Sequence, residues 1–276
     1  TSDEQYMINE AVEKAKENDM IIIALGEDEK RTGESRSRTS LELPGRQQQL
    51  LEALYSTGTP IVLVLINGQP LTINWADRHI PAILECWFPS VQGGSAIAET
   101  LFGEYNPGGK LTVTFPKSTG QIEYNFPFKK GSHGSQPGNG PNGSGETRVL
   151  GSIYPFGHGL SYTEFKYGTV TPSATKVKRG DKLSAEVTVT NTGSRDGAET
   201  VHWFISDPYC SITRPVKELK HFEKQLIKAG ETKTFRFDID LERDFGFVNE
   251  DGKRFLEAGE YHILVQGQTV KIELID

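Results

Sequence analysis

The chain has 276 residues, which is enough for two domains of ordinary size. Its 30 basic and 37 acidic residues give a net charge of -7, which argues against a nucleic-acid-binding protein, because such proteins carry clustered basic surfaces. No apolar run reaches the roughly 18 residues that a membrane-spanning helix needs. The two cysteines, Cys86 and Cys210, are too few for a disulfide scaffold or a zinc site.

The first half of the chain alternates between helical and strand patterns. Helical periodicity covers residues 4–17, 47–57 and 93–102, and continuous apolar runs cover residues 20–25, 61–66 and 81–88. Continuous hydrophobicity predicts parallel strands that are buried on both faces. The helix over 93–102 is expected to turn Ile97, Ala98, Leu101 and Phe102 inward. The alternation predicts an α/β domain with a parallel sheet, and since only three strands appear, we expect earlier strands to be missing from this chain.

The second half changes its period. Apolar and polar residues alternate over 183–190, 200–205, 232–239 and 261–265, and turn-forming clusters separate these runs. Short alternating strands at this spacing predict an antiparallel β-sandwich of about a hundred residues. The aromatic residues expected in its core are Trp203, Phe204, Phe222, Phe235 and Phe237.

A stretch rich in Gly, Ser, Pro and Asn lies between the two halves, over residues 131–145. It has little to bury, so we expect a mobile loop. The predicted division is therefore a partial α/β domain over 1–128, a glycine-rich loop and connection over 129–162, and an all-β domain over 163–276.

Candidate chemistry is concentrated in the loop over residues 26–45. The six histidines contain no pair with metal-ligand spacing, and the glycine motifs that bind phosphates and dinucleotides are absent, so we expect neither a metal nor a cofactor. The loop follows the end of a predicted strand, where α/β sheets bind ligands. It carries five carboxylates, at Glu27, Asp28, Glu29, Glu34 and Glu42. Spacing alone does not select one of them, and a solvated acidic surface loop remains the alternative.

Five stretches, in order, carry a resemblance to a known family: 62–70 (VLVLINGQP), 82–94 (AILECWFPSVQGG), 96–116 (AIAETLFGEYNPGGKLTVTFP), 154–163 (YPFGHGLSYT) and 214–223 (RPVKELKHFE). Together they resemble glycoside hydrolase family 3, the family of β-glucosidases and β-xylosidases. The bacterial β-glucosidase type with a C-terminal fibronectin type III-like domain is the nearest match. The resemblance implies the second, α/β sandwich domain of that family, followed by the fibronectin type III-like β-sandwich.

The resemblance also implies site residues. In the family, the general acid/base is a Glu a few residues before a Leu-Pro or Ile-Pro pair, and Glu34 lies nine positions before Leu43-Pro44. Many members have Gly after this Glu, where this chain has Ser35. Arg38 also fits the pattern, either as an ion pair that holds the loop or as a substrate-binding residue. Glu27 and Glu29 are the alternatives for the acid.

Trp87 is a further candidate for substrate binding, because an aromatic ring can stack on a sugar. A retaining glycosidase needs a second carboxylate as the nucleophile, about 5–5.5 Å from the acid. The family places it, as an Asp, on an N-terminal barrel of about 250 residues. This chain has no room for that barrel, so we expect the barrel to be a missing partner domain and the isolated chain to be inactive.

The expected function is therefore that of the C-terminal part of a retaining, exo-acting β-glucosidase that acts on a β-linked glucoside or oligosaccharide. The alternatives are a β-xylosidase fragment and a non-catalytic structural or carbohydrate-binding module. Neither nucleic acid nor a membrane span is expected. The resemblance favours a periplasmic or secreted location.

Overall fold

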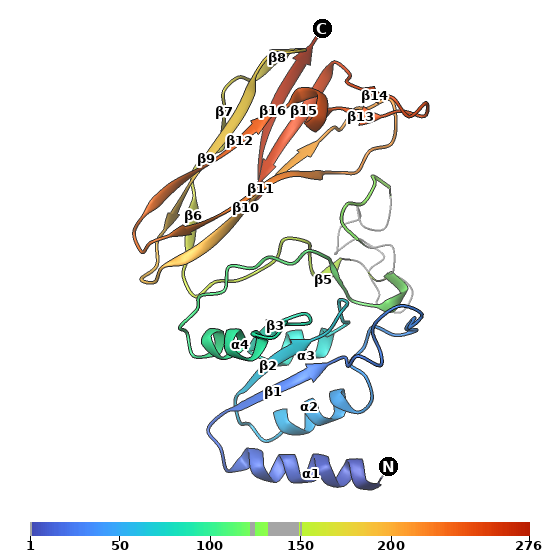
Figure 1. Ribbon diagram of the computed structural model, residues 1–276, viewed down its shortest axis with the longest axis vertical. Helices are drawn as coiled ribbons and strands as arrows, with labels where there is room; N and C mark the ends of the chain where they lie inside the picture. The colour runs from blue at the N-terminus through green and yellow to red at the C-terminus, as the bar shows by residue number, and fades with distance from the viewer. Residues whose placement is uncertain (1, 122–124, 132–148, 150) are drawn as a thin grey trace. The chain divides into compact units, whose positions relative to one another are not determined.

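The computed structural model describes residues 2–121, 125–131, 149 and 151–276. These residues form two compact units (Figure 1). Unit 1 comprises 2–101, 113–121, 149 and 151–155, and unit 2 comprises 102–112, 125–131 and 156–276. Because the units interleave along the chain, no single residue separates them, and the division at residues 128 and 163 stays a prediction. Residues 132–145, which make up most of the expected mobile loop, lie outside the described residues.

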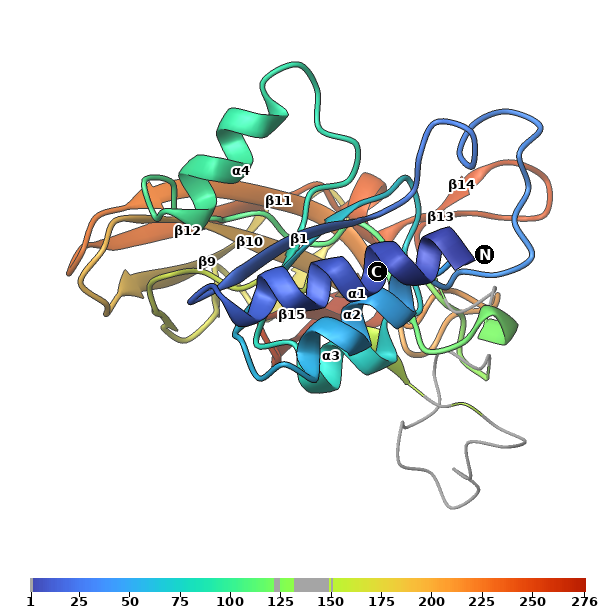
Figure 2. The ribbon, with the colours of Figure 1, turned by 90° about the horizontal axis from the view of Figure 1, so that it is seen from below.

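A three-stranded parallel sheet is the centre of unit 1. Its strands β1 (Ile21–Gly26), β2 (Ile61–Ile66) and β3 (Ala82–Glu85) lie in the order β1-β2-β3, as the apolar runs predicted. Helices α1 (Ser2–Lys16) and α2 (Gln47–Tyr55) lie side by side on one face of this sheet (Figures 1 and 2). The parallel arrangement places the carboxyl ends of all three strands at one edge.

Apolar side chains seal the helices to the sheet. Ile8 and Ala15 of α1 and Leu51 and Leu54 of α2 are buried, in agreement with the helical periodicity. The centre of the sheet is buried even more completely, since Leu63 and Leu65 of β2 have no exposed surface. β2 is therefore the buried central strand, and the loops at the carboxyl edge of the sheet are anchored beside it.

Three short elements complete unit 1. Helix α3 (Asn74–His79), which the sequence did not indicate, lies between β2 and β3 in the chain. Strands β4 (Phe115–Pro116) and β5 (Ser152–Tyr154) pair in antiparallel fashion, and a 3-10 turn covers Thr119–Gln121. No helix among the described residues is long and apolar enough to cross a membrane.

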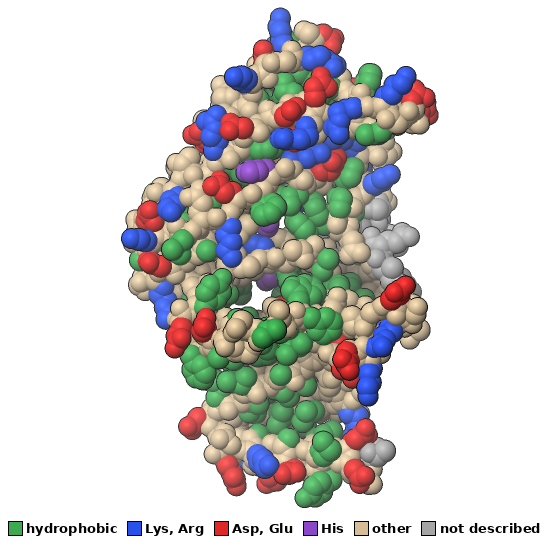
Figure 3. All heavy atoms as spheres, in the orientation of Figure 1, with side chains coloured by type: hydrophobic (Ala, Val, Ile, Leu, Met, Phe, Trp, Pro, Cys, Tyr) green, Lys and Arg blue, Asp and Glu red, His purple; other side chains and the backbone are tan. Residues whose placement is uncertain are grey.

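Two expectations about burial in unit 1 are wrong. β1 and β3 are not buried on both faces, because both lie at edges of the sheet: Ile22 of β1 remains 50% exposed, and Ala82 of β3 is exposed as well. In α4 (Gly93–Leu101), Ala98 is exposed, and Phe102 just beyond it is 78% exposed. The described residues supply too little partner surface for these apolar faces. Figure 3 shows hydrophobic side chains gathered over the sheet and α4.

Unit 2 contains a two-sheet β-sandwich, as the alternating pattern predicted. One sheet has the order β11-β10-β15-β16-β8, and the other has the order β12-β9-β6, with β7 paired to β9. The bounds of these strands are β6 (Phe165–Tyr167), β7 (Thr171–Pro172), β8 (Lys176–Lys178), β9 (Leu183–Asn191), β10 (Gly197–Ser206), β11 (Glu218–Ile227), β12 (Thr232–Ile239), β15 (Gly259–Val265) and β16 (Gln268–Ile275). A π-helical turn over Leu241–Phe245 precedes a small hairpin of β13 (Phe247–Val248) and β14 (Arg254–Phe255).

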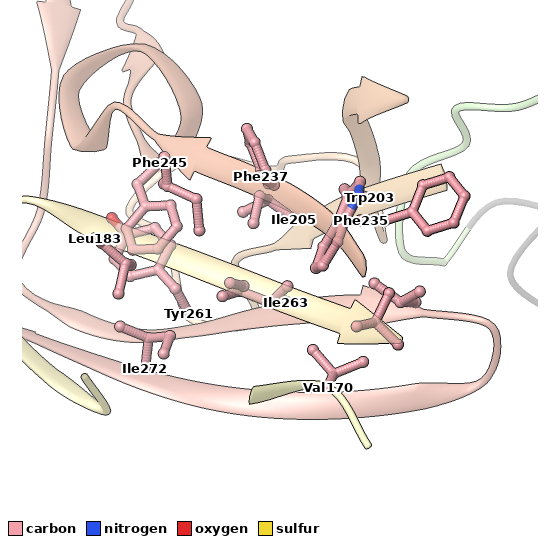
Figure 4. Packing of buried hydrophobic residues seen from close by; sticks show 14 of the residues in the cluster. Val170, Leu183, Trp203, Ile205, Phe235, Phe237, Phe245, Tyr261, Ile263 and Ile272 are labelled. Carbon is pink, nitrogen blue, oxygen red and sulfur yellow. The ribbon is translucent and has the colours of Figure 1, made fainter. Parts of the chain in front are cut away.

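Aromatic residues from both sheets fill the core of the sandwich (Figure 4). Trp203 of β10 and Phe235 of β12 are completely buried, and the rings of Phe245 and Tyr261 stack 4.3 Å apart. Phe222 was expected in this core but is 62% exposed, because alternation along β11 turns the neighbouring His221 inward, where it stacks on Phe237, and leaves Phe222 on the outer face. Cys86 and Cys210 are both free.

Candidate active-site loop

The acidic loop starts where β1 ends, at the carboxyl edge of the parallel sheet. Gly26 has a φ of +137°, and a Cβ built there would lie 2.0 Å from the carbonyl oxygen of Ile66. Only glycine fits at this position. Gln47, the first residue of α2, closes the loop on the other side: its side chain accepts from the Gly26 N–H at 2.8 Å and donates to the Gly26 carbonyl at 2.9 Å. The start of the loop at Gly26 is therefore joined to the start of α2 by the side chain of Gln47.

Glu34 lies at the tip of this loop and is exposed. It sits between Gly33, with a φ of +137°, and Ser35, with a φ of +62°. These two positive φ angles, one on each side of Glu34, turn the chain at this residue. No described residue forms an ion pair or a hydrogen bond with its carboxylate, which is left available to a ligand.

The backbone at Ser35 gives a physical reason for the glycine that many family members have here. The left-handed region costs a residue with a Cβ roughly 1–2 kcal/mol, and glycine adopts it freely. Serine can occupy the position, but it does so under strain. Ser35 therefore differs from the family's glycine in its side chain, while its backbone still has the positive φ that glycine would favour.

Arg38 forms an ion pair with Glu27, and both side chains are largely withdrawn from solvent. The Glu27 side chain is completely buried and that of Arg38 is 14% exposed. Arg38 also donates to the carbonyl oxygen of Glu42 at 2.8 Å. Glu27 is therefore occupied by structural contacts, and the geometry favours Arg38 as a residue that holds the loop.

The ends of β2 and β3 contribute a second group of polar residues, which the sequence analysis missed. Asn67 follows β2 and donates to a Glu85 carboxylate oxygen at 3.3 Å and to the Gln69 carbonyl at 2.8 Å. Glu85 ends β3 and accepts from the Trp87 N–H at 2.8 Å. The signal that could have revealed these residues is their position, since each polar residue directly follows or ends a strand at the same edge of the parallel sheet.

Burial raises the pKa of Glu85 to about 7, and the neighbouring Glu27 carboxylate adds to the shift. Hydrogen bonds from Trp87 and Asn67 oppose it. The Asn67 side-chain oxygen is buried, and no residue that the structure describes forms a hydrogen bond with it. Glu85 thus exchanges a proton near neutral pH, directly beside the ion pair that holds the loop.

Trp87 lies just beyond β3 in a left-handed conformation, with a φ of +52°. The Glu85 side chain bonds its N–H, and its carbonyl accepts from the Asn67 N–H at 3.2 Å, so the strained backbone is held on both sides. Its ring centroid lies 5.9 Å from that of Phe115, and Phe115 lies 6.0 Å from Tyr154. Trp87 is partly buried in this aromatic row, and its role in sugar binding stays a prediction.

The loop also surrounds a hollow of about 440 Å³. Its lining consists of cationic and hydroxyl side chains: Lys30, Arg31, Arg36, Ser37, Arg38, Thr39 and Ser40. Arg31 is paired with Asp28, and Arg36 donates to the carbonyl of Glu29, whose own side chain is exposed. Among the described residues, no group of three or more His, Cys, Asp and Glu could hold a metal ion.

Comparison with known proteins identifies the class of protein to which this site belongs. Residues 3–162 match the glycosyl hydrolase family 3 C-terminal domain, and residues 199–269 match a fibronectin type III-like domain. The chain belongs to glycoside hydrolase family 3, and it corresponds to the C-terminal part of such enzymes.

Individual relatives give the same assignment. The chain is 41% identical to a periplasmic β-glucosidase of Salmonella typhimurium and 39% identical to a β-xylosidase of Formosa agariphila, and these matches cover 98% and 93% of it. Among solved structures, a β-glucosidase from Erythrobacter marinus superposes with a TM-score of 0.89 at 37% identity, over 99% of this chain and 37% of that one. A Listeria innocua β-glucosidase in complex with isofagomine gives 0.88 at 32% identity, over 98% and 38%. The chain spans 35% of the length of both curated relatives.

The raised pKa of Glu85 predicts a pH-dependent stability. Between the ordinary pKa of 4.5 and about 7, the folded chain binds more protons than the unfolded chain. The free energy of unfolding should therefore fall as the pH rises through this range and level off above it. Thermal unfolding between pH 5 and pH 8 measures the slope, which Glu85→Gln should reduce. Glu99→Gln, which removes an exposed carboxylate of α4, is the control, and equal slopes in both variants would contradict the assignment.

The left-handed backbone at Ser35 predicts a difference between two substitutions. Ser35→Gly relieves the strain, whereas Ser35→Val places a β-branched side chain where it is least tolerated. We expect the valine variant to be less stable than the glycine variant by about 1 kcal/mol or more. Urea unfolding of both variants and the parent chain provides the comparison. Equal stability of the two variants would mean that position 35 is not left-handed in solution.

Proposed function

We propose that this chain supplies the general acid/base of a retaining, exo-acting β-glucosidase, and that Glu34 is that residue. The observation that carries the proposal is the position of Glu34: an exposed carboxylate, paired with no described residue, at the tip of a loop whose base is anchored at the carboxyl edge of a parallel sheet. The motif resemblance singles out the same residue among the five carboxylates of the loop.

The chemistry requires a proton donor and a nucleophile on opposite sides of the glycosidic bond. Glu34 would protonate the leaving oxygen while a second carboxylate attacks the anomeric carbon, and it would then activate the water that releases the sugar. A general acid works best where burial or a neighbouring carboxylate disfavours its charged form. Since Glu34 is exposed in this chain, that environment would come from the surface that carries the nucleophile. This requirement supports a barrel domain as the partner.

The substrate proposed is a terminal β-linked glucoside. The relative from Salmonella is a β-glucosidase and the one from Formosa a β-xylosidase, so a β-xyloside is the second candidate. The two differ by the hydroxymethyl group of the sugar, which separate assays on aryl glucosides and xylosides would distinguish. A periplasmic or secreted location is proposed from the name of the Salmonella relative.

The role of Glu34 is tested by Glu34→Gln in a full-length enzyme that contains this chain. The substitution removes the proton but keeps the shape, so kcat/KM for a phenyl glucoside should fall by about a hundredfold or more. A dinitrophenyl glucoside needs no protonation of its leaving group and should lose much less. Added azide should restore turnover of this second substrate, because azide replaces the water that Glu34 activates. Parent activity on the phenyl glucoside would remove Glu34 from the mechanism.

A second prediction concerns the chain alone. We expect no hydrolysis of a dinitrophenyl β-glucoside by these 276 residues, because the proposed nucleophile lies outside them. The assay uses release of the dinitrophenolate, with the full-length enzyme as the positive control. Turnover that disappears in Glu34→Gln would place a nucleophile within this chain. It would overturn the proposal that the nucleophile lies on a separate domain. Binding of glucose measured by calorimetry would instead favour a carbohydrate-binding module.

A further inference from the structure

The carboxylate of Glu27 is the most densely bonded acid of the loop. Two loop residues donate to it, Arg38 and, at 3.4 Å, the hydroxyl of Thr32. Two groups that follow β2 also donate to it: the N–H of Gly68 at 3.1 Å and the side chain of Gln69 at 3.0 Å. We call these five residues the Glu27 cluster. A carboxylate buried as deeply as this one destabilises a fold unless it is paired and hydrogen-bonded, and here it is both.

Glu34 lies in the chain between Thr32 and Arg38, the two loop residues that donate to Glu27. Thr32 lies two residues before Glu34, and Arg38 lies four residues after it. Both arms of the tip thus converge on one carboxylate, and only residues 33–37 project beyond it. Such a short excursion restricts where the Glu34 carboxylate can reach.

The other half of the cluster fixes this arrangement to the sheet. Gly68 is the second residue after β2, and a Cβ built on it would lie 2.6 Å from the Thr32 methyl group and 2.7 Å from the ring of Phe88. The first arm of the loop therefore packs against bare backbone. The second arm is held farther along, where Leu41 accepts from the Thr72 N–H at 2.8 Å.

We propose that Glu27 is a positioning residue for Glu34, acting through Thr32 and Arg38 to hold the tip of the loop at a fixed place relative to the carboxyl edge of the sheet. This inference rests on the proposed role of Glu34 as the general acid/base. Glu27 does not itself touch the substrate. A proton donor displaced by about an ångström loses much of its effect, so the arrangement bears directly on rate.

The test is Glu27→Gln in the full-length enzyme. The amide keeps the shape, but it loses the charge and turns an N–H toward groups that are themselves donors. If the tip shifts, kcat/KM for the phenyl glucoside should fall by about tenfold to a hundredfold, with a much smaller loss for the dinitrophenyl glucoside. A general loss of structure would lower both values alike. Glu42→Gln, an exposed carboxylate of the same loop, is the matched control and should behave as the parent enzyme.

A second variant decides the matter if Glu27→Gln does not fold. Arg38→Lys keeps the positive charge but cannot bridge Glu27 and the Glu42 carbonyl together, so it should show the same selective loss in a milder form. Equal losses on both substrates, or parent activity in a folded Glu27→Gln variant, would overturn the proposal. If Glu34→Gln itself shows no dependence on the leaving group, the proposed function fails first and this inference fails with it.

Discussion

A fully buried carboxylate is among the most demanding groups that a protein interior can contain, and the arrangement at the carboxyl edge of unit 1 follows from satisfying one. Glu27 directly follows Gly26, whose backbone lies against the Ile66 carbonyl, and its own N–H donates to that carbonyl at 2.8 Å. Its charge then requires a cation and several N–H or O–H donors, and the loop and the end of β2 provide them. The path of the loop depends on this pairing, and the exposure of Glu34 follows from that path.

The same constraint extends to the third strand. Burial raises the pKa of Glu85 to about 7, and the nearby Glu27 carboxylate adds to the shift. Glu27 itself is paired with Arg38. The left-handed Trp87 is held by Glu85 and by the backbone of Asn67, so the strain at the end of β3 is stored beside the network that anchors the loop.

The sequence was sufficient for features that depend on a single chain segment. Continuous apolar runs predicted the three parallel strands, and alternation predicted β9, β10, β12 and β15. It was insufficient where the outcome depends on neighbours: Ile22, Ala98 and Phe102 are apolar yet exposed. Phe222 faces outward because the register of β11 turns His221 toward Phe237 instead. In the candidate site, the motif indicated Glu34 and Arg38, but spacing could not show that Glu27 is the partner of Arg38, since that depends on the fold of the loop.

The clamp between Gln47 and Gly26 has a consequence for how this family can vary. Because the Gln47 side chain joins the end of β1 to the start of α2, the segment between them is a loop whose two ends are held together. Residues inserted or deleted between these ends would change the reach of the tip without straining the sheet, since closing a somewhat longer loop adds little entropic cost. The sheet and the reach of the loop that carries Glu34 can thus change separately.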